Sequence, residues 1–443
     1  MSSGATKIVI PGFYTWANKG DAALLMSFLP WLRGRLGNIE VVVTSFTPAE
    51  DSDYFGERVI DMPTCPNRRF HLAQELVASR VPGARIALSH GRLLAFRVLR
   101  NYLTHWAVVF LRAPRLARLL VTSSVYRVAE EIQSADAVIT VPGGYLNAYR
   151  VTNDWWLFHL PTLWLAAALG KRPILGPCSL GPFDERHQRE ARHVLSLAQL
   201  ILVREQPSYD VARKLGVPAS RIRQTPDMAF AFEHEDRTSE GDEVLEHVRR
   251  LASGRQLVGV SVRDHNYPGH SDPESMQHKY LDAIVEALLE LQQTHDAYPV
   301  ILPQTEEDQA LGRELQGRLH QKQVEVCNVT ANLGPSDLQS IYAQLRLLIG
   351  TRMHANILAM GAGTVVAAIA YEPKTTGILR AMGLDDWGIA IDAVAEGALA
   401  KLALAQWQAA TDLGDVAKQR AAEQKMRLAE AADLLATAMG QPR

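Results

Sequence analysis

Short apolar runs rich in β-branched residues alternate along most of this chain with amphipathic stretches long enough to form helices. This alternation is typical of parallel βα units and not of a β-sandwich or a helix bundle. The sequence therefore predicts an α/β protein. The predicted strands are residues 7–13, 39–46, 137–142, 172–178 and 200–204 in the first half, and 257–262, 298–303, 324–329, 346–350 and 364–370 in the second.

The two groups of predicted strands indicate two doubly wound sheets, one in each half of the chain. A length of 443 residues exceeds one ordinary domain of roughly 150 residues. Between the halves, residues 233–242 are polar and acidic, with no apolar residue to anchor them in a core, so we interpret them as a linker. We predict Rossmann-like domains at 1–235 and 243–393, followed by a helical segment at 394–443 that is rich in Ala, Leu, Glu and Lys.

Composition narrows the class of protein. With 47% hydrophobic and 21% charged residues the chain resembles soluble globular proteins, and its net charge of -2 argues against coating of nucleic acid. Cys65, Cys178 and Cys327 are widely spaced and indicate neither a disulfide framework nor a zinc site. We recognise no secretory signal and no apolar run of roughly 18 residues, so we expect a cytoplasmic protein.

One stretch departs from this average composition. Residues 76–129 contain nine arginines among apolar and aromatic residues, and no Asp or Glu. Such a basic amphipathic surface suits peripheral contact with an anionic membrane, here the inner face of the cytoplasmic membrane. It equally suits an acidic saccharide or polyphosphate acceptor, or helices whose solvated arginines cover the core with their stems. The sequence leaves these interpretations open.

Polar residues follow the first predicted strand at 18–24, which reads NKGDAAL. Doubly wound sheets place ligands at the carboxyl ends of their strands. Gly20 permits close approach of a backbone, and Asn18 stands beside helix-start amides that favour anions. Asp21 either caps the helix or faces the ligand.

Two further strand ends in the first half carry candidate residues. The run that ends at Gly143 and Gly144 predicts a buried strand followed by a flexible turn. Arg204 ends the predicted strand 200–204, and we expect it to face the ligand side.

The strongest candidate site lies in the second half, where a predicted strand ends in a Gly-Thr turn and a helix begins. Arg352 and His354 stand beside the free N–H groups of that helix start, an arrangement suited to phosphate or carboxylate. Arginine binds either anion bidentately and histidine delivers a proton near neutral pH. Alternatively, both residues only pair with neighbouring carboxylates. Arg263, Gln304 and Lys374 follow other strands of this half and should meet in the same crevice.

In the order and spacing of its motifs, the chain from Lys7 to about Ile391 resembles the polysaccharide pyruvyltransferase family. The motifs are NKGDAAL at 18–24, VPGG at 141–144, VREQPS at 203–208, PDMAF at 226–230, GTRMHANILAMGAGT at 350–364 and YEPK at 371–374. The resemblance implies a fold of the GT-B type, with two Rossmann-like domains that face a cleft. The N-terminal domain would then lie on the acceptor side and the C-terminal domain on the donor side.

The resemblance also implies an activity. Family members transfer pyruvate from phosphoenolpyruvate to a hexose of a cell-surface polysaccharide or its lipid-linked precursor, and a cyclic ketal results. Arg352 and His354 match the Arg-x-His donor site of the family, and Arg204 matches the arginine expected to face it. We predict His354 as the general acid, Asp21 as the base, and Arg204, Arg352 and Lys374 as partners for the roughly three charges of phosphoenolpyruvate. We expect no cofactor and no metal.

Two other classes of function remain open. A GT-B glycosyltransferase or a sugar-nucleotide epimerase shares the two-domain architecture and would bind a nucleotide diphosphate sugar, and fold alone does not separate these activities. A non-catalytic protein that binds membrane or polysaccharide would use the basic stretch 76–129.

Overall fold

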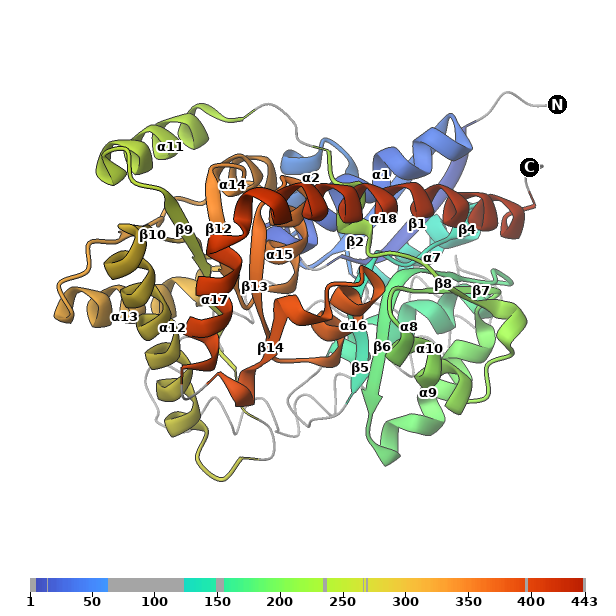
Figure 1. The fold of residues 1–443 in the computed structure, drawn as a ribbon. Helices are drawn as coiled ribbons and strands as arrows, with labels where there is room; N and C mark the ends of the chain where they lie inside the picture. Colours follow the sequence, from blue (N-terminus) through green and yellow to red (C-terminus); the bar gives the residue numbers. More distant parts are fainter. Residues whose placement is uncertain are drawn as a thin grey trace, which may run out of the picture. The chain divides into compact units, whose positions relative to one another are not determined.

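The protein forms two compact units, each built on parallel β-sheets and drawn in the computed structural model of Figure 1. The first unit comprises Met1–Trp16, Phe28–Thr225 and Glu430–Arg443, and the second comprises Ala17–Ser27 and Pro226–Ala429. All strand pairs in the described residues are parallel, which confirms the predicted α/β class. The structure describes residues 5–13, 15–62, 123–148, 155–233, 237–265, 267, 270–394 and 397–440.

The first unit contains two four-stranded sheets, of order β3-β2-β1-β4 and β5-β6-β7-β8. A parallel bridge between Ile139 and Ile174 connects them. The strands are β1 (Thr6–Phe13), β2 (Ile39–Ser45), β3 (Arg58–Asp61), β4 (Ala137–Val138), β5 (Gly143–Ala148), β6 (Ile174–Phe183), β7 (Leu200–Val203) and β8 (Ile222–Gln224). The helices include α1 (Lys19–Leu36), which begins among residues of the second unit, and α2 (Pro48–Phe55), α7 (Ser123–Ser134), α8 (Trp155–Ala168), α9 (Glu185–Leu197) and α10 (Gln206–Lys214).

The second unit contains one six-stranded sheet of order β11-β10-β9-β12-β13-β14. Successive strands run outward from β9 on one side and from β12 on the other, so the strand order reverses between these two. The strands are β9 (Leu257–Ser261), β10 (Tyr298–Ile301), β11 (Cys327–Asn328), β12 (Leu345–Gly350), β13 (Val365–Ala370) and β14 (Gly388–Ala390). The helices are α11 (Ser239–Ala252), α12 (Pro273–His295), α13 (Glu306–Gln321), α14 (Pro335–Tyr342), α15 (Met353–Gly361) and α16 (Pro373–Ala381).

The reversal of strand order positions the site. In an open α/β sheet, ligands bind beyond the carboxyl ends of the strands at such a switch point. Here β9 and β12 lie side by side, and β9 and β13 are buried along their whole length. The residues that follow β9 and β12 are therefore held by a rigid, close-packed support.

The predicted C-terminal helical segment is confirmed: α17 (Ala398–Gln408) and α18 (Ala410–Ala438) fill most of it. The polar stretch 233–242, interpreted as a linker, includes the first turn of α11, which Thr238 caps by accepting a hydrogen bond from the Gly241 amide. Of the basic stretch 76–129, residues 76–122 lie outside the described residues. None of the helices in the described ranges has the length and apolar character needed to cross a bilayer.

Candidate functional site

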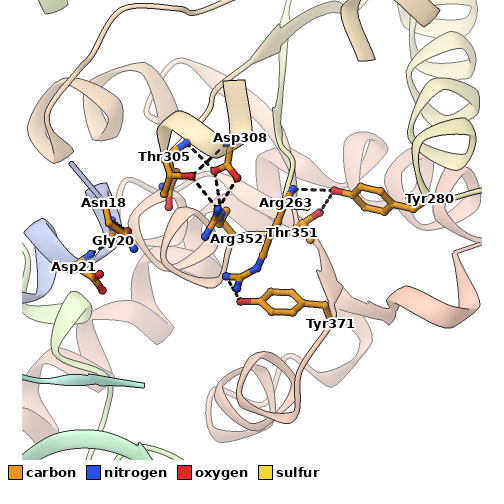
Figure 2. Close-up of polar contacts among 11 residues, drawn as sticks. Asn18, Gly20, Asp21, Arg263, Tyr280, Thr305, Asp308, Thr351, Arg352 and Tyr371 are labelled. Atoms are coloured by element: carbon orange, nitrogen blue, oxygen red, sulfur yellow. Dashed lines mark hydrogen bonds and ion pairs between the residues drawn. The ribbon is translucent and has the colours of Figure 1, made fainter. Parts of the chain in front are cut away.

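Arg263 and Arg352 stand at the switch point of the second unit, directly after β9 and β12 (Figure 2). The phenol of Tyr280 connects the two strand ends, because its oxygen accepts a hydrogen bond from the Arg263 amide at 3.2 Å and lies 2.7 Å from Thr351 Oγ1. Burial raises the pKa of Tyr280, so this phenol stays neutral. The two arginines thus start from fixed backbone positions.

The guanidinium of Arg352 is clamped onto the first turn of α13. Its Nε donates to Asp308 Oδ2 at 2.9 Å, and its Nη2 donates to Asp308 Oδ1 and to Thr305 Oγ1 (Figure 2). The Asp308 side chain is fully buried and the Arg352 side chain is 13% exposed. Arg352 therefore does pair with a carboxylate, as the alternative interpretation of the sequence has it. The clamp uses Nε and Nη2 and leaves Nη1 outside it, so the pairing is compatible with binding of an anion.

The imidazole of His354, in the first turn of α15, packs directly on Gly20. A Cβ atom built at Gly20 would lie 2.9 Å from Cγ and 3.0 Å from Cβ of His354, and closer still to its Nδ1. Gly20 is therefore needed because the imidazole occupies the space of a side chain. The sequence pattern had instead indicated that a bound ligand occupies this space. On the opposite edge of the ring, Nε2 lies 4.0 Å from Oδ2 of the buried residue Asp227.

Asn18, and not Asp21, caps the start of α1. The Oδ1 atom of Asn18 accepts hydrogen bonds from the amides of Gly20 at 3.1 Å and Asp21 at 3.4 Å. The prediction that these helix-start amides bind an anion is corrected accordingly, because the asparagine side chain already satisfies them. Asp21 lies buried in the first turn of the helix.

Lys19 is a further residue of this region that sequence reasoning missed. It is 4% exposed, and its Nζ donates to Asn332 Oδ1 at 2.6 Å. Burial lowers the pKa of Lys19 to about 8. A lysine at a helix start is usually solvated, so the sequence offered no signal for this burial. The amide of Lys19 donates to the carbonyl of Gln304 at 3.2 Å.

Gln304 does not use its side chain as expected. Its Nε2 donates to the buried phenol of Tyr342 at 3.0 Å, and the residue is 2% exposed. The side-chain amide of Gln304 therefore belongs to the core of the second unit. Because it points at Tyr342, its orientation does not support the prediction that it contacts substrate. Only its backbone carbonyl meets Lys19.

Arg263 and Lys374 converge on the ring of Tyr371. Arg263 Nη1 donates to the phenol at 2.7 Å with its guanidinium 4.4 Å from the ring centroid, and Lys374 Nζ lies 5.6 Å from that centroid. Lys374 also pairs with Glu372 at 2.6 Å. Burial alone would raise the pKa of Glu372, but the charges of Lys374 and Arg263 outweigh it and hold that pKa below its usual range. The predicted convergence of these two cations is thus found, at the ring of Tyr371.

Arg204 belongs to the first unit and is buried there. Its Nε donates to Ser179 Oγ at 2.7 Å and lies 3.6 Å from Glu205 Oε2. Glu205 also accepts hydrogen bonds from the hydroxyls of Ser179 and Ser208, so the arginine is one member of a buried polar network. The expected orientation toward a ligand stays a prediction.

The prediction of a flexible turn at Gly143 and Gly144 is wrong. Gly143 begins β5 and pairs with Cys178 of β6. A Cβ atom at Gly143 would lie 2.9 Å from Cζ and 3.0 Å from Cδ2 of Tyr145, whose ring also stacks on His159 at 5.1 Å. The glycine is needed because the tyrosine ring occupies this space, which the local sequence pattern does not reveal.

The sequence is similar to known proteins along most of its length. A sequence model of the polysaccharide pyruvyl transferase family matches residues 18–373, which include Arg204, Arg352 and His354. The amylovoran biosynthesis protein AmsJ of Erwinia amylovora is 22% identical over 408 residues, which cover 89% of this chain and 90% of AmsJ.

Several solved structures share the fold. The UDP-GlcNAc 2-epimerase of Neisseria meningitidis, bound to UDP-GlcNAc, superposes with a TM-score of 0.58 at 10% identity and covers 98% of this chain and 99% of its own. A glycosyltransferase from Rickettsia africae gives a TM-score of 0.56 at 12% identity, with 99% and 100% covered. Anabaena HepE with UDP and glucose gives 0.53 at 14% identity, with 99% and 100% covered. At these identities the likeness concerns the fold, and it confirms the GT-B-like prediction.

Proposed function

The chain belongs to the polysaccharide pyruvyl transferase family, and on this premise we propose that it moves pyruvate from phosphoenolpyruvate to a hexose. The acceptor is a cell-surface polysaccharide or its lipid-linked precursor, and the products are a cyclic ketal and phosphate. The proposal rests on the position of Arg352 and His354 at the start of α15. Arg263 and Lys374 follow other strands of the same sheet, at the same carboxyl ends. A relative named for biosynthesis of a polysaccharide supports the acceptor class.

The charge of the donor explains the number of cations. Phosphoenolpyruvate carries roughly three negative charges at neutral pH, and binding requires groups that replace its hydration. Arg352 offers Nη1 beyond its clamp with Asp308, and the first amides of α15 have no acceptor within the helix. Arg263 and Lys374 supply further positive charge at the same edge. Arg204 of the first unit is the remaining cation that we assign to the donor.

The proposed reaction begins with proton transfer from His354 to the methylene carbon of phosphoenolpyruvate. The electron pair of the C=C bond forms the new C–H bond, and the neighbouring carbon becomes an oxocarbenium-like centre. One sugar hydroxyl adds to this carbon, the C–O bond to phosphate breaks, and the second hydroxyl closes the ketal. The hydroxyl protons pass to a base, for which we propose Asp21, and the phosphate takes the released electron pair.

We propose that no cofactor or metal is needed, because the arginines offset the phosphate charge. Enzyme treated with a chelator should keep its rate of phosphate release. Activity that falls after this treatment and returns with a divalent cation would refute this part of the proposal.

The proposed function is tested by phosphate release from phosphoenolpyruvate with envelope glycolipid as acceptor. Arg352→Ala and His354→Ala should each lower kcat/KM by at least about 100-fold, since each removes a group used in the transition state. Arg380→Ala and His278→Ala serve as matched controls, because both side chains are exposed on helices of the same unit. Phosphate release at the parent rate in both Arg352→Ala and His354→Ala would refute the proposed site.

The rival activity acts on a nucleotide diphosphate sugar, and it is favoured by fold relatives solved with UDP-GlcNAc or UDP-glucose. Ligand stabilisation separates the two, because a ligand that binds the native state raises Tm. We expect phosphoenolpyruvate to raise Tm more than UDP-glucose or UDP-GlcNAc at equal concentration. The reverse order would favour the rival. Cytoplasmic location and membrane contact through 76–129 stay predictions.

A further inference from the structure

We propose that Asp227 is a positioning residue that fixes the imidazole of His354 and keeps it charged for proton transfer. This inference rests on the function proposed above. Asp227 immediately precedes the short helix Met228–Ala231, and its Oδ1 accepts the amide of Ala229 at 2.8 Å. The other carboxylate oxygen, Oδ2, lies 4.0 Å from Nε2 of His354.

The imidazole is bracketed on its two nitrogen edges. Its Nδ1 edge packs on the backbone of Gly20, where a single methyl group would not fit, and its Nε2 edge faces Asp227. Because the ring itself sits on the first turn of α15, three separate segments of the second unit define its position. A ring held in this way keeps a single orientation, and a fixed orientation of the acid is part of what proton transfer to a carbon requires.

The carboxylate also acts through its charge. Asp227 is 1% exposed, and a buried carboxylate is costly unless hydrogen bonds or a cation compensate it. An opposite charge within about 4–6 Å favours the charged form of a titrating group, so Asp227 and a protonated His354 stabilise each other. The other charged groups on these segments are Lys19 and Asp21, beside Gly20, and Arg352, at the cap of α15.

Two of these neighbours have partners elsewhere. Arg352 is clamped by Asp308 and Lys19 donates to Asn332, and the carboxylate of Asp227 lies within ion-pair distance of Nε2 of the imidazole. The geometry therefore assigns the electrostatic control of His354 first to Asp227.

The test is Asp227→Asn, which keeps an oxygen to accept the Ala229 amide and removes the charge. The titration of His354 is followed by NMR of the full chain labelled with ¹⁵N-histidine, and His354→Gln identifies its resonance. We expect His354 in the native protein to titrate above the ordinary histidine value of about 6.5, and Asp227→Asn to lower its pKa by about 1–3 units. Asp272→Asn, at another aspartate that caps a helix, is the matched control and should leave His354 unchanged.

Kinetics provide a second readout. If His354 acts as an acid, the alkaline limb of the kcat profile should move to lower pH in Asp227→Asn, with a smaller change in KM for phosphoenolpyruvate. A His354 that titrates at or below about 6.5 in the native protein, or that does not respond to Asp227→Asn, overturns the inference. Because the titration is measured without substrate, a chain that shows the expected pKa shift but no phosphate release would refute the proposed function alone.

Discussion

Replacing Gly20 with alanine places a methyl group where the imidazole of His354 lies. The distances of 2.9 Å to Cγ and 3.0 Å to Cβ are shorter than almost any real contact of a Cβ atom, and Nδ1 would be closer still. In a helix, alanine is normally favoured over glycine by about 0.5–1 kcal/mol. At this position the overlap should dominate, because forcing extra atoms into a packed site costs about 1–3 kcal/mol.

The same helix offers a matched control. Gly34 is exposed in α1, and a Cβ atom there would meet no described atom within 4 Å. Gly34→Ala should therefore stabilise the protein by about 0.5–1 kcal/mol, whereas Gly20→Ala should destabilise it. The shifts are read from thermal unfolding, where 1 kcal/mol corresponds to roughly 2–4 °C for a unit of this size.

A double variant isolates the contact. In Gly20→Ala combined with His354→Ala the overlap is gone, so most of the lost stability should return while activity stays low. Gly20→Ala alone should lower kcat by about 100-fold, since displacement of a catalytic group by about 1 Å has this effect. A Gly20→Ala protein as stable and active as the parent would refute the proposed seat of the imidazole.

Three further predictions concern charged groups of the second unit. Asp308→Ala leaves the guanidinium of Arg352 without its carboxylate partner and should cost about 3–5 kcal/mol of unfolding free energy, measured by urea titration, with weaker binding of phosphoenolpyruvate. Burial lowers the pKa of Lys19 to about 8, so between pH 8 and 10.5 the unfolded chain binds more protons than the folded protein does. The free energy of unfolding should therefore rise as pH increases through this window, and Lys19→Met should abolish the rise. Lys374 holds the pKa of Glu372 low despite burial, so the stability that the ionised Glu372 contributes is present above pH 4.5 and is lost as pH falls below it. The difference in unfolding free energy between the parent and Glu372→Gln should therefore shrink as pH falls below 4.5.

The sequence predicted most of the fold because the apolar pattern of each strand and helix depends only on residues that are close together in the chain. The predicted strands at 7–13, 346–350 and 364–370 agree closely with β1, β12 and β13. Arg352 and His354 were placed at a helix start for the same reason, since a strand, a Gly-Thr turn and a helix follow one another directly. Short strands such as β3 and β8 carry too few residues for an apolar pattern and were missed.

The partners of the site residues were not predictable, because they come from distant parts of the chain. Asp308 stands 44 positions before Arg352, and Asp227 lies in a motif to which the sequence assigned no role. Gly20 belongs to a segment that clusters with the second unit although it lies near the N-terminus. The turn predicted at Gly143 failed in the same way, since the ring that excludes a side chain there is set by tertiary packing.

The proton that reaches the donor carbon gives the most direct test of the account. With phosphoenolpyruvate and acceptor in D₂O, the account predicts that the transferred group gains one deuterium in its methyl group, visible by mass spectrometry of the ketal. It also predicts that His354→Ala forms little of this product. A ketal whose methyl group contains no deuterium, or transfer that proceeds at the parent rate without His354, would contradict the central claim.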